Sequence, residues 1–276
     1  MSSLIGSFFQ GSQPPATASS PSPTASASPT ARKEELAAQA KGYELVLQRE
    51  PENQTALRGL LEARLGLGDV KGAITPLEKL AKLNPKETYY SVLLAQAKQQ
   101  LGDREGAAQT YRSILAAQPG DMLALQGLVG LLVEQKRPEA AIGLLQDTLK
   151  TATQANQVQP NSVDVASVQV LLGGVYASQK RYDEAIAIYD EAAKTSKQDF
   201  RPIYGKAVLF KEQGKTEEAK PLFTKAAELA PAKYKDLINQ VSSSAAPGST
   251  APATVPGVSP SQTAPVPGQP APVTSP

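Results

Sequence analysis

The sequence predicts an all-α protein in which about five helical hairpins stack into a solenoid. Three observations predict this class. Prolines recur every 34 residues, small alanines recur in the same register with a large residue one turn later, and all charged residues lie between Arg32 and Asp236. A fixed period of about 20–50 residues is typical of architectures in which one structural unit stacks on the next.

The proline period sets the boundaries of the hairpins. Pro51, Pro85 and Pro119 are 34 residues apart, and Pro231 follows Pro119 after three further periods plus 10 residues. Proline ends a helix because it lacks an N–H group and restricts the residue before it. The predicted repeats lie near 54–87, 88–121, 122–155, 166–199 and 200–233. The extra residues, roughly Thr153 to Asp164, are expected to lengthen the adjoining helices or to form a loop.

Inside each repeat, a small residue and a large one stand four positions apart. The small positions hold Ala73, Ala107, Ala141, Ala185 and Ala219, and the large positions hold Leu77, Tyr111, Leu145, Tyr189 and Phe223. An alanine lets two helices approach closely, and the larger residue a turn later fills the gap beside it. Turns with Gly68, Gly102 and Gly214 are expected between the paired helices, because glycine accepts a positive φ.

The solenoid is expected to span residues 33–241. Within it, Lys33–Glu50 and Tyr234–Val241 are predicted to be capping helices, since a terminal repeat otherwise exposes an apolar face. Residues 1–32 form a Pro/Ser/Thr-rich segment with a short apolar start, and residues 242–276 form a Pro/Ala-rich tail. Such segments cannot bury enough apolar surface to offset chain entropy, so both are predicted to be disordered.

Composition excludes several classes of function. The 28 basic and 26 acidic residues nearly balance, which gives no reason to expect a nucleic-acid partner. The chain has no Cys and no His, and therefore lacks the usual nucleophile–base pairs and the commonest metal ligand. The glycine-rich segments Gly66–Gly72 and Gly214–Thr216 lack the spacing of nucleotide-binding loops and are interpreted as turns. We therefore expect no catalytic residues, no bound metal and no cofactor.

The five units in register resemble the tetratricopeptide repeat family. The fourth unit shows the pattern most fully, with Leu172-Gly173 and Tyr176 in the first helix and Tyr182–Ala185 opening the second. The resemblance implies a right-handed superhelix whose first helices line a concave groove that binds an extended peptide or a helix of another protein. The family's groove positions fall here on Thr55, Arg58, Glu62, Tyr89, Val92, Gln96, Gln99, Leu123, Gln126, Val170, Arg201, Tyr204, Val208 and Lys211.

A finer resemblance concerns short strings within the repeats. Asp199–Pro202, Leu80–Pro85 and Leu93–Gln96 are similar to strings in the slow-green-like tetratricopeptide proteins of plastids and cyanobacteria. This resemblance implies a non-catalytic scaffold or assembly factor at a thylakoid or plasma membrane of a cyanobacterium-like cell, with peripheral membrane association. The alternatives are a cytoplasmic location and a regulatory module that senses a signalling peptide or small ligand.

The N-terminal segment Leu4–Phe9 is apolar but far shorter than the roughly 20 residues that span a bilayer. It also lacks the basic start of a signal peptide. Three interpretations stay open: an interfacial foot, the end of a membrane helix that begins upstream, or a loose terminus.

Overall fold

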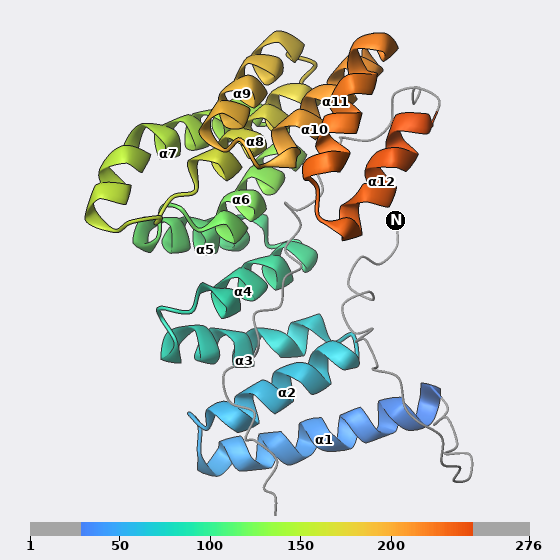
Figure 1. Cartoon of the computed structure of the whole chain (residues 1–276). Helices are drawn as coiled ribbons and strands as arrows, with labels where there is room; N and C mark the ends of the chain where they lie inside the picture. Colours follow the sequence, from blue (N-terminus) through green and yellow to red (C-terminus); the bar gives the residue numbers. More distant parts are fainter. Residues whose placement is uncertain (1–28, 245–276) are drawn as a thin grey trace, which may run out of the picture. The chain divides into compact units, whose positions relative to one another are not determined.

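The computed structural model describes residues 29–244. The apolar segment Leu4–Phe9 lies outside the described residues, as does most of the sequence in which disorder is predicted. Between residues 29 and 244 all regular secondary structure is α-helical, in agreement with the predicted class. Each helix packs against the next one in the sequence, so the helices follow one another as a stack (Figure 1).

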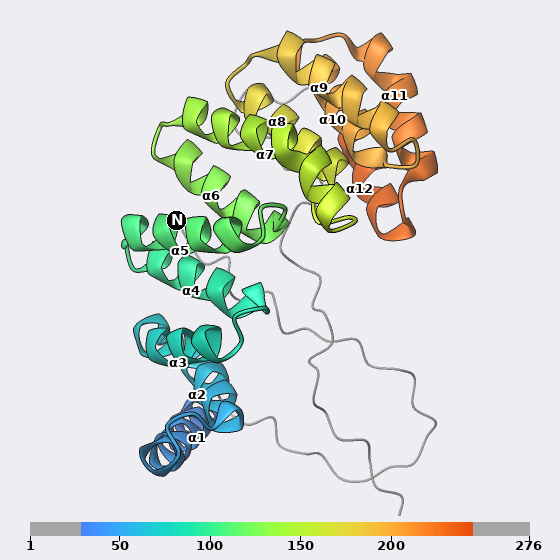
Figure 2. The same ribbon diagram turned by 90° about the vertical axis from the view of Figure 1, so that its left-hand side faces the viewer.

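The helices pair as hairpins between two flanking helices. In chain order they are α1 (Pro29–Arg49), α2 (Gln54–Gly66), α3 (Val70–Leu83), α4 (Thr88–Gln100), α5 (Arg104–Ala117), α6 (Met122–Glu134), α7 (Pro138–Val158), α8 (Val165–Ser178), α9 (Tyr182–Thr195), α10 (Phe200–Glu212), α11 (Thr216–Leu229) and α12 (Ala232–Ser243). The even-numbered helices from α2 to α10 are the first helices of the hairpins, and the odd-numbered helices from α3 to α11 are the second helices. Figure 2 shows the same succession from the side.

The small and large positions predicted from the sequence lie in the core. All five alanines of the small set are buried, and so are the five large residues that follow them by four positions. Because the alanine Cβ occupies little space, the paired helices approach closely at this level and the large side chain fills the adjacent gap. The repeat in the sequence is therefore a repeat in helix packing.

The turns inside the hairpins all pass through a residue with positive φ. Gly68, Gly102 and Gly214 take this role, as predicted, with φ of 75°, 86° and 75°. In the third and fourth hairpins the same position holds Lys136 and Lys180, with φ of 60° and 59°. A left-handed conformation is unfavourable for a residue with a Cβ, so these two turns are less stable locally than the glycine turns.

The ten-residue insertion both lengthens a helix and forms a loop. Helix α7 continues to Val158, and the following turn returns to α8. Asn156 holds this turn closed: its Nδ2 donates to the Val163 carbonyl at 2.9 Å, and its Oδ1 accepts from the Val163 amide at 2.8 Å. The turn packs against Gly120, where a side chain would overlap the Ser162 carbonyl.

Candidate protein-binding groove

The first helices form one continuous layer. Helix α4 contacts α6, α6 contacts α8, and α8 contacts α10, although each pair is separated in sequence by a second helix. A surface made by neighbouring first helices can contact a partner along several repeats at once. The groove positions predicted from the sequence lie on these helices, and the structure separates them into an accessible group and a buried group.

The accessible group lies on α2, α4 and α6. Thr55, Glu62 and Tyr89 are exposed, and Arg58, Gln96, Gln99, Leu123 and Gln126 are partly exposed. The Tyr89 side chain is 55% exposed and is the most exposed aromatic group among the described residues. Its ring contacts that of Tyr90 edge to face, with centroids 5.5 Å apart. Partial burial raises the pKa of the Tyr89 hydroxyl, with smaller contributions from Tyr90 and Glu62, so this hydroxyl is a neutral donor at physiological pH.

Two hydrogen bonds tie neighbouring first helices together within this group. The Arg58 Nε on α2 donates to the Tyr90 hydroxyl on α4 at 3.0 Å. The Gln99 Nε2 on α4 donates to Glu134 Oε2 on α6 at 3.0 Å. These bonds fix the relative positions of α2, α4 and α6 at the surface, which reduces the entropy lost when a partner binds there.

The buried group requires a correction. The expectation that Val92, Val170, Tyr204 and Val208 project into an open groove is not met, because all four side chains lie in the core. Val92 and Val170 are enclosed between successive first helices and their neighbours. Repeat register alone places these residues on the inner side of a helix, but close approach of the next helix removes them from solvent.

Helix α12 covers α10, the first helix of the fifth hairpin. Lys211 is 4% exposed, and its Nζ donates to the Val241 carbonyl and, at 3.0 Å, to the Ser244 hydroxyl. Phe200 at the start of α10 stacks on Tyr234 of α12, with centroids 5.3 Å apart. Burial lowers the pKa of the Lys211 ammonium, which uses carbonyl and hydroxyl oxygens in place of water. Lys211 is therefore a capping residue in this structure and is withdrawn from the candidate surface.

Arg201 is occupied by intramolecular partners. Its guanidinium donates to both carboxylate oxygens of Asp199, at distances from 2.7 to 3.0 Å, and to the Ser167 hydroxyl at 2.8 Å. A partner carboxylate would have to displace Asp199, whose position beside Arg201 in sequence makes it the stronger competitor. Arg201 therefore links α8 to α10 and is not a free contact.

Two accessible residues of the layer were missed from the sequence. Gly130 is exposed on α6 at the position equivalent to Glu62 and Gln96, where it leaves the surface open. Glu134 binds Gln99 and contributes a negative charge near the end of α6. The 34-residue repeat could have identified Gly130, which lies one period after Gln96. Glu134 is identified only by its hydrogen bond with Gln99.

Two further properties of the described residues concern metal ions and membranes. No group of three or more acidic residues in the part from 29 to 244 is placed to hold a metal ion. None of the helices described there is long and apolar enough to cross a membrane. What the arrangement offers is a rigid layer of amide, aromatic and charged groups.

These features define an α-helical solenoid of stacked hairpins, and the family comparison agrees. The tetratricopeptide repeat model matches residues 32–232, and the chain belongs to this family. The chain is 29% identical over 233 residues to the protein SLOW GREEN 1, chloroplastic, of Arabidopsis thaliana; the match covers 84% of this chain and 72% of the relative. A cellulose synthase operon protein C of Pseudomonas fluorescens is 31% identical over 111 residues, which cover 38% of this chain and 9% of that protein.

Solved structures of other proteins are similar to this chain. Yeast Tom70 superposes with a TM-score of 0.52 at 14% identity, over 74% of this chain and 42% of Tom70. The thermophilic protein TTC0263 of Thermus thermophilus is 23% identical, with a TM-score of 0.44, over 68% of this chain and 98% of that protein. Proteins with this fold are typically non-catalytic scaffolds, and the fold supports a general role in protein interaction.

Proposed function

We propose that the chain is a non-catalytic scaffold or assembly factor that holds a segment of a partner protein against α2, α4 and α6. The exposed Tyr89, fixed beside Tyr90 and flanked by partly exposed glutamines, carries this proposal. Tyrosine gives a large amphipathic contact with little side-chain entropy to lose, and such residues dominate binding energies at many protein interfaces.

The glutamines favour an extended peptide as the bound form. Gln96 is partly exposed and carries one acceptor oxygen and an amide that donates two hydrogen bonds. Gln99 keeps its acceptor oxygen and one N–H beside the bond to Glu134. The Gln126 Oε1 is buried, so this oxygen does not take part. An extended peptide presents unpaired N–H and carbonyl groups along its backbone, and side-chain amides can pair with both. A helix satisfies its own backbone groups and would use these amides less.

A photo-crosslinking amino acid placed at position 89 tests the proposal. We expect it to capture discrete partner proteins in cells, whereas the same amino acid at the exposed Val158 on the α7 extension captures none of them. Tyr89→Ala should weaken binding of a captured partner by about 1–2 kcal/mol while leaving the thermal midpoint nearly unchanged. Equal crosslinking at positions 89 and 158 would contradict the proposal.

We also propose that this scaffold acts at a photosynthetic membrane as a peripheral protein. The chloroplastic relative supports a location in a photosynthetic compartment. An assembly factor should capture several subunits of a membrane complex and co-fractionate with thylakoids until washed with high salt. Capture of one soluble protein, with the chain wholly in the soluble fraction, would instead identify a regulatory module.

A further inference from the structure

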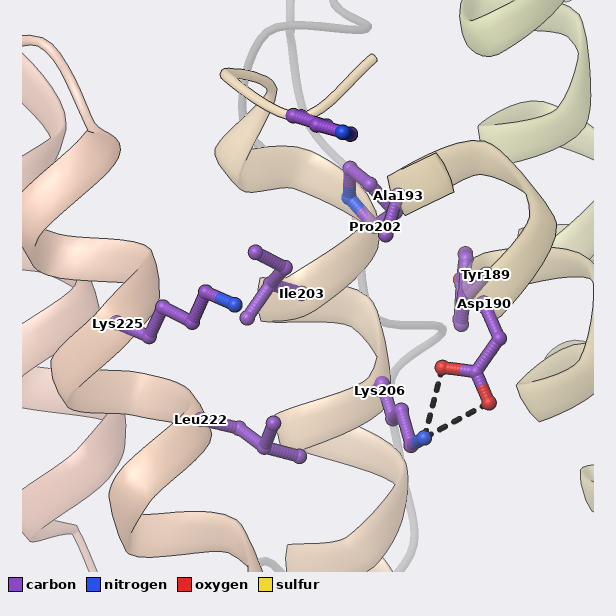
Figure 3. A pocket seen from close by; sticks show the side chains of 9 residues that line it. Tyr189, Asp190, Ala193, Pro202, Ile203, Lys206, Leu222 and Lys225 are labelled. Carbon is purple, nitrogen blue, oxygen red and sulfur yellow. Dashed lines mark hydrogen bonds and ion pairs between the residues drawn. The ribbon is translucent and has the colours of Figure 1, made fainter. Parts of the chain in front are cut away.

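A separate concave site lies on another side of the solenoid. It is a cleft of about 290 Å³ with α9 and α11 as its walls and α10 as its floor (Figure 3). Its lining residues are Tyr189, Asp190, Ala193, Lys197, Pro202, Ile203, Lys206, Leu222 and Lys225. This volume is enough for one or two side chains of a partner, but small for a drug-sized ligand, whose pockets are typically about 300–1,000 Å³.

The cleft faces away from the candidate groove. Successive residues of an α-helix are separated by about 100° around its axis. Pro202, Ile203 and Lys206 therefore share one side of α10. The groove positions Tyr204 and Lys211, which α12 and the core cover, lie on the opposite side. A partner in the cleft and a partner on α2, α4 and α6 would thus contact separate surfaces.

The cleft carries an excess of positive charge. Lys206 is paired, since its Nζ donates to Asp190 Oδ1 and Oδ2 at 2.7 and 2.9 Å (Figure 3). Lys197 and Lys225 are exposed and make no hydrogen bond or ion pair with any described residue. Asp190 is the single acidic lining residue and is already engaged, so two ammonium groups remain for an external anion.

Apolar side chains lie between these charges. Ile203 lies between Lys225 and the Lys206–Asp190 pair, and Leu222 of α11 also lines the cleft (Figure 3). Ile203 is buried and Leu222 is partly buried, so a contact with Leu222 would remove apolar surface from water. An ion alone would use the lysines and leave this apolar wall unused.

An equivalent cleft elsewhere in the solenoid has different chemistry. It lies between α3 and α5 over α4, with a volume of about 470 Å³. We call it the first cleft because it comes earlier in the chain. Its positions equivalent to Ile203, Leu222 and Lys225 hold Ser91, Thr110 and Ser113. The fold therefore accepts small hydroxyl residues at these positions, and packing does not require the basic and apolar lining near α10.

We propose that the cleft between α9 and α11 is a docking site for a segment of a partner protein that carries a carboxylate next to an aliphatic or aromatic side chain. The carboxylate pairs with Lys197 or Lys225, and the apolar side chain lies on Leu222. A lipid surface fits less well, because α9 and α11 also expose acidic residues, Glu191, Glu217, Glu218 and Glu228, which an anionic membrane would repel.

A library of random dodecapeptides selected against the full chain tests this site. Two variants serve as counter-selection targets. K197Q/K225Q removes only charge at exposed positions, and L222T/K225S installs the residues that the fold already accepts in the first cleft. T110A/S113A, in the first cleft, is the matched control. Thermal midpoints of all variants show that the fold is retained.

We expect enriched peptides to carry Asp or Glu adjacent to Leu, Ile, Val or Phe. Their affinity should fall at least about tenfold for K197Q/K225Q and L222T/K225S, but not for T110A/S113A, and should weaken as salt rises. Enriched peptides that lack carboxylates, or that bind all variants equally, would overturn the proposal. So would an absence of enriched peptides together with lysine-dependent binding to phosphatidylglycerol vesicles.

This test is separate from that of the groove. A peptide whose binding is lost in Tyr89→Ala but retained in K197Q/K225Q belongs to the surface of α2, α4 and α6. Failure at either site therefore leaves the result for the other unaffected.

Discussion

The phenol ring of Tyr111 occupies the space that a side chain at Gly127 would need. This relationship recurs between second helices and the first helices that follow them. Tyr189 of α9 is placed in the same way against Gly205, and Tyr43 of the flanking helix α1 against Gly59. Two repeats have leucine at the position equivalent to Tyr111, and in both the position equivalent to Gly127 is also leucine. These pairs are Leu77 with Leu93 and Leu145 with Leu171. The interface between repeats thus uses two different side-chain pairs at equivalent positions.

Replacing the Tyr111–Gly127 pair by two leucines should restore part of the stability lost in the single variants. Gly127→Leu should destabilise by about 1–3 kcal/mol through overlap with the ring, and Tyr111→Leu by a similar amount through the cavity it leaves. The double variant should be less destabilised than the sum by about 0.5–3 kcal/mol. Urea unfolding of the four proteins measures this coupling. Strict additivity would show that the two side chains do not share one space.

Helix α12 should contribute stability through its inward face alone. Ile238 is fully buried, whereas the neighbouring Leu237 is 41% exposed. Ile238→Ala should therefore cost about 2–5 kcal/mol, and Leu237→Ala, the matched control on the same helix, less than about 1 kcal/mol. Chemical denaturation gives both values. Equal costs would mean that α12 does not pack on α10 and α11 as described.

The turn before α9 should be improved by glycine. Lys180 has a φ of 59°, a region that is unfavourable for residues with a Cβ. Lys180→Gly should raise the free energy of unfolding by about 1 kcal/mol, because glycine accepts this conformation at the equivalent turns. Lys180→Ala keeps the strained backbone and should be nearly neutral. Similar stabilities for the Gly and Ala variants, measured by thermal unfolding, would contradict the positive φ.

The fold should lose stability in alkali because of its buried tyrosines. Burial, with a smaller contribution from Glu134, raises the pKa of Tyr111 from 10.0 to about 12, and burial raises that of Tyr189 further. The unfolded chain loses the Tyr111 proton near pH 10, whereas the folded chain retains it. The associated stability is therefore complete below about pH 10 and is lost as the pH rises towards 12.

Tyr111→Phe isolates this effect from other groups that titrate in alkali. Its free energy of unfolding should fall less steeply than that of the original chain between about pH 10 and 12, since phenylalanine has no proton to lose. Urea unfolding at a series of pH values gives both slopes. Parallel slopes would show that the Tyr111 hydroxyl ionises equally well in the folded state.

The sequence by itself determined the fold class. The 34-residue period, the alanine and large-residue positions, and the glycine turns depend on contacts between neighbouring elements of the chain. Because each repeat makes nearly the same contacts as the one before it, this information recurs and can be read locally. For the same reason the register also identified Tyr89 and the glutamines on α4 and α6 as surface positions of the first helices.

Only the tertiary structure decided which of those positions are accessible. Lys211 occupies the same register position as Gln99 of an earlier repeat, which is partly exposed, yet Lys211 is buried because α12 covers α10. The pairing of Arg201 with Asp199 and Ser167, the Tyr111–Gly127 contact and the cleft above Ile203 likewise depend on side chains from separate helices. A repeated pattern specifies how one unit meets the next. The ends of the stack and the side-chain partners that differ between units are specific to the folded chain.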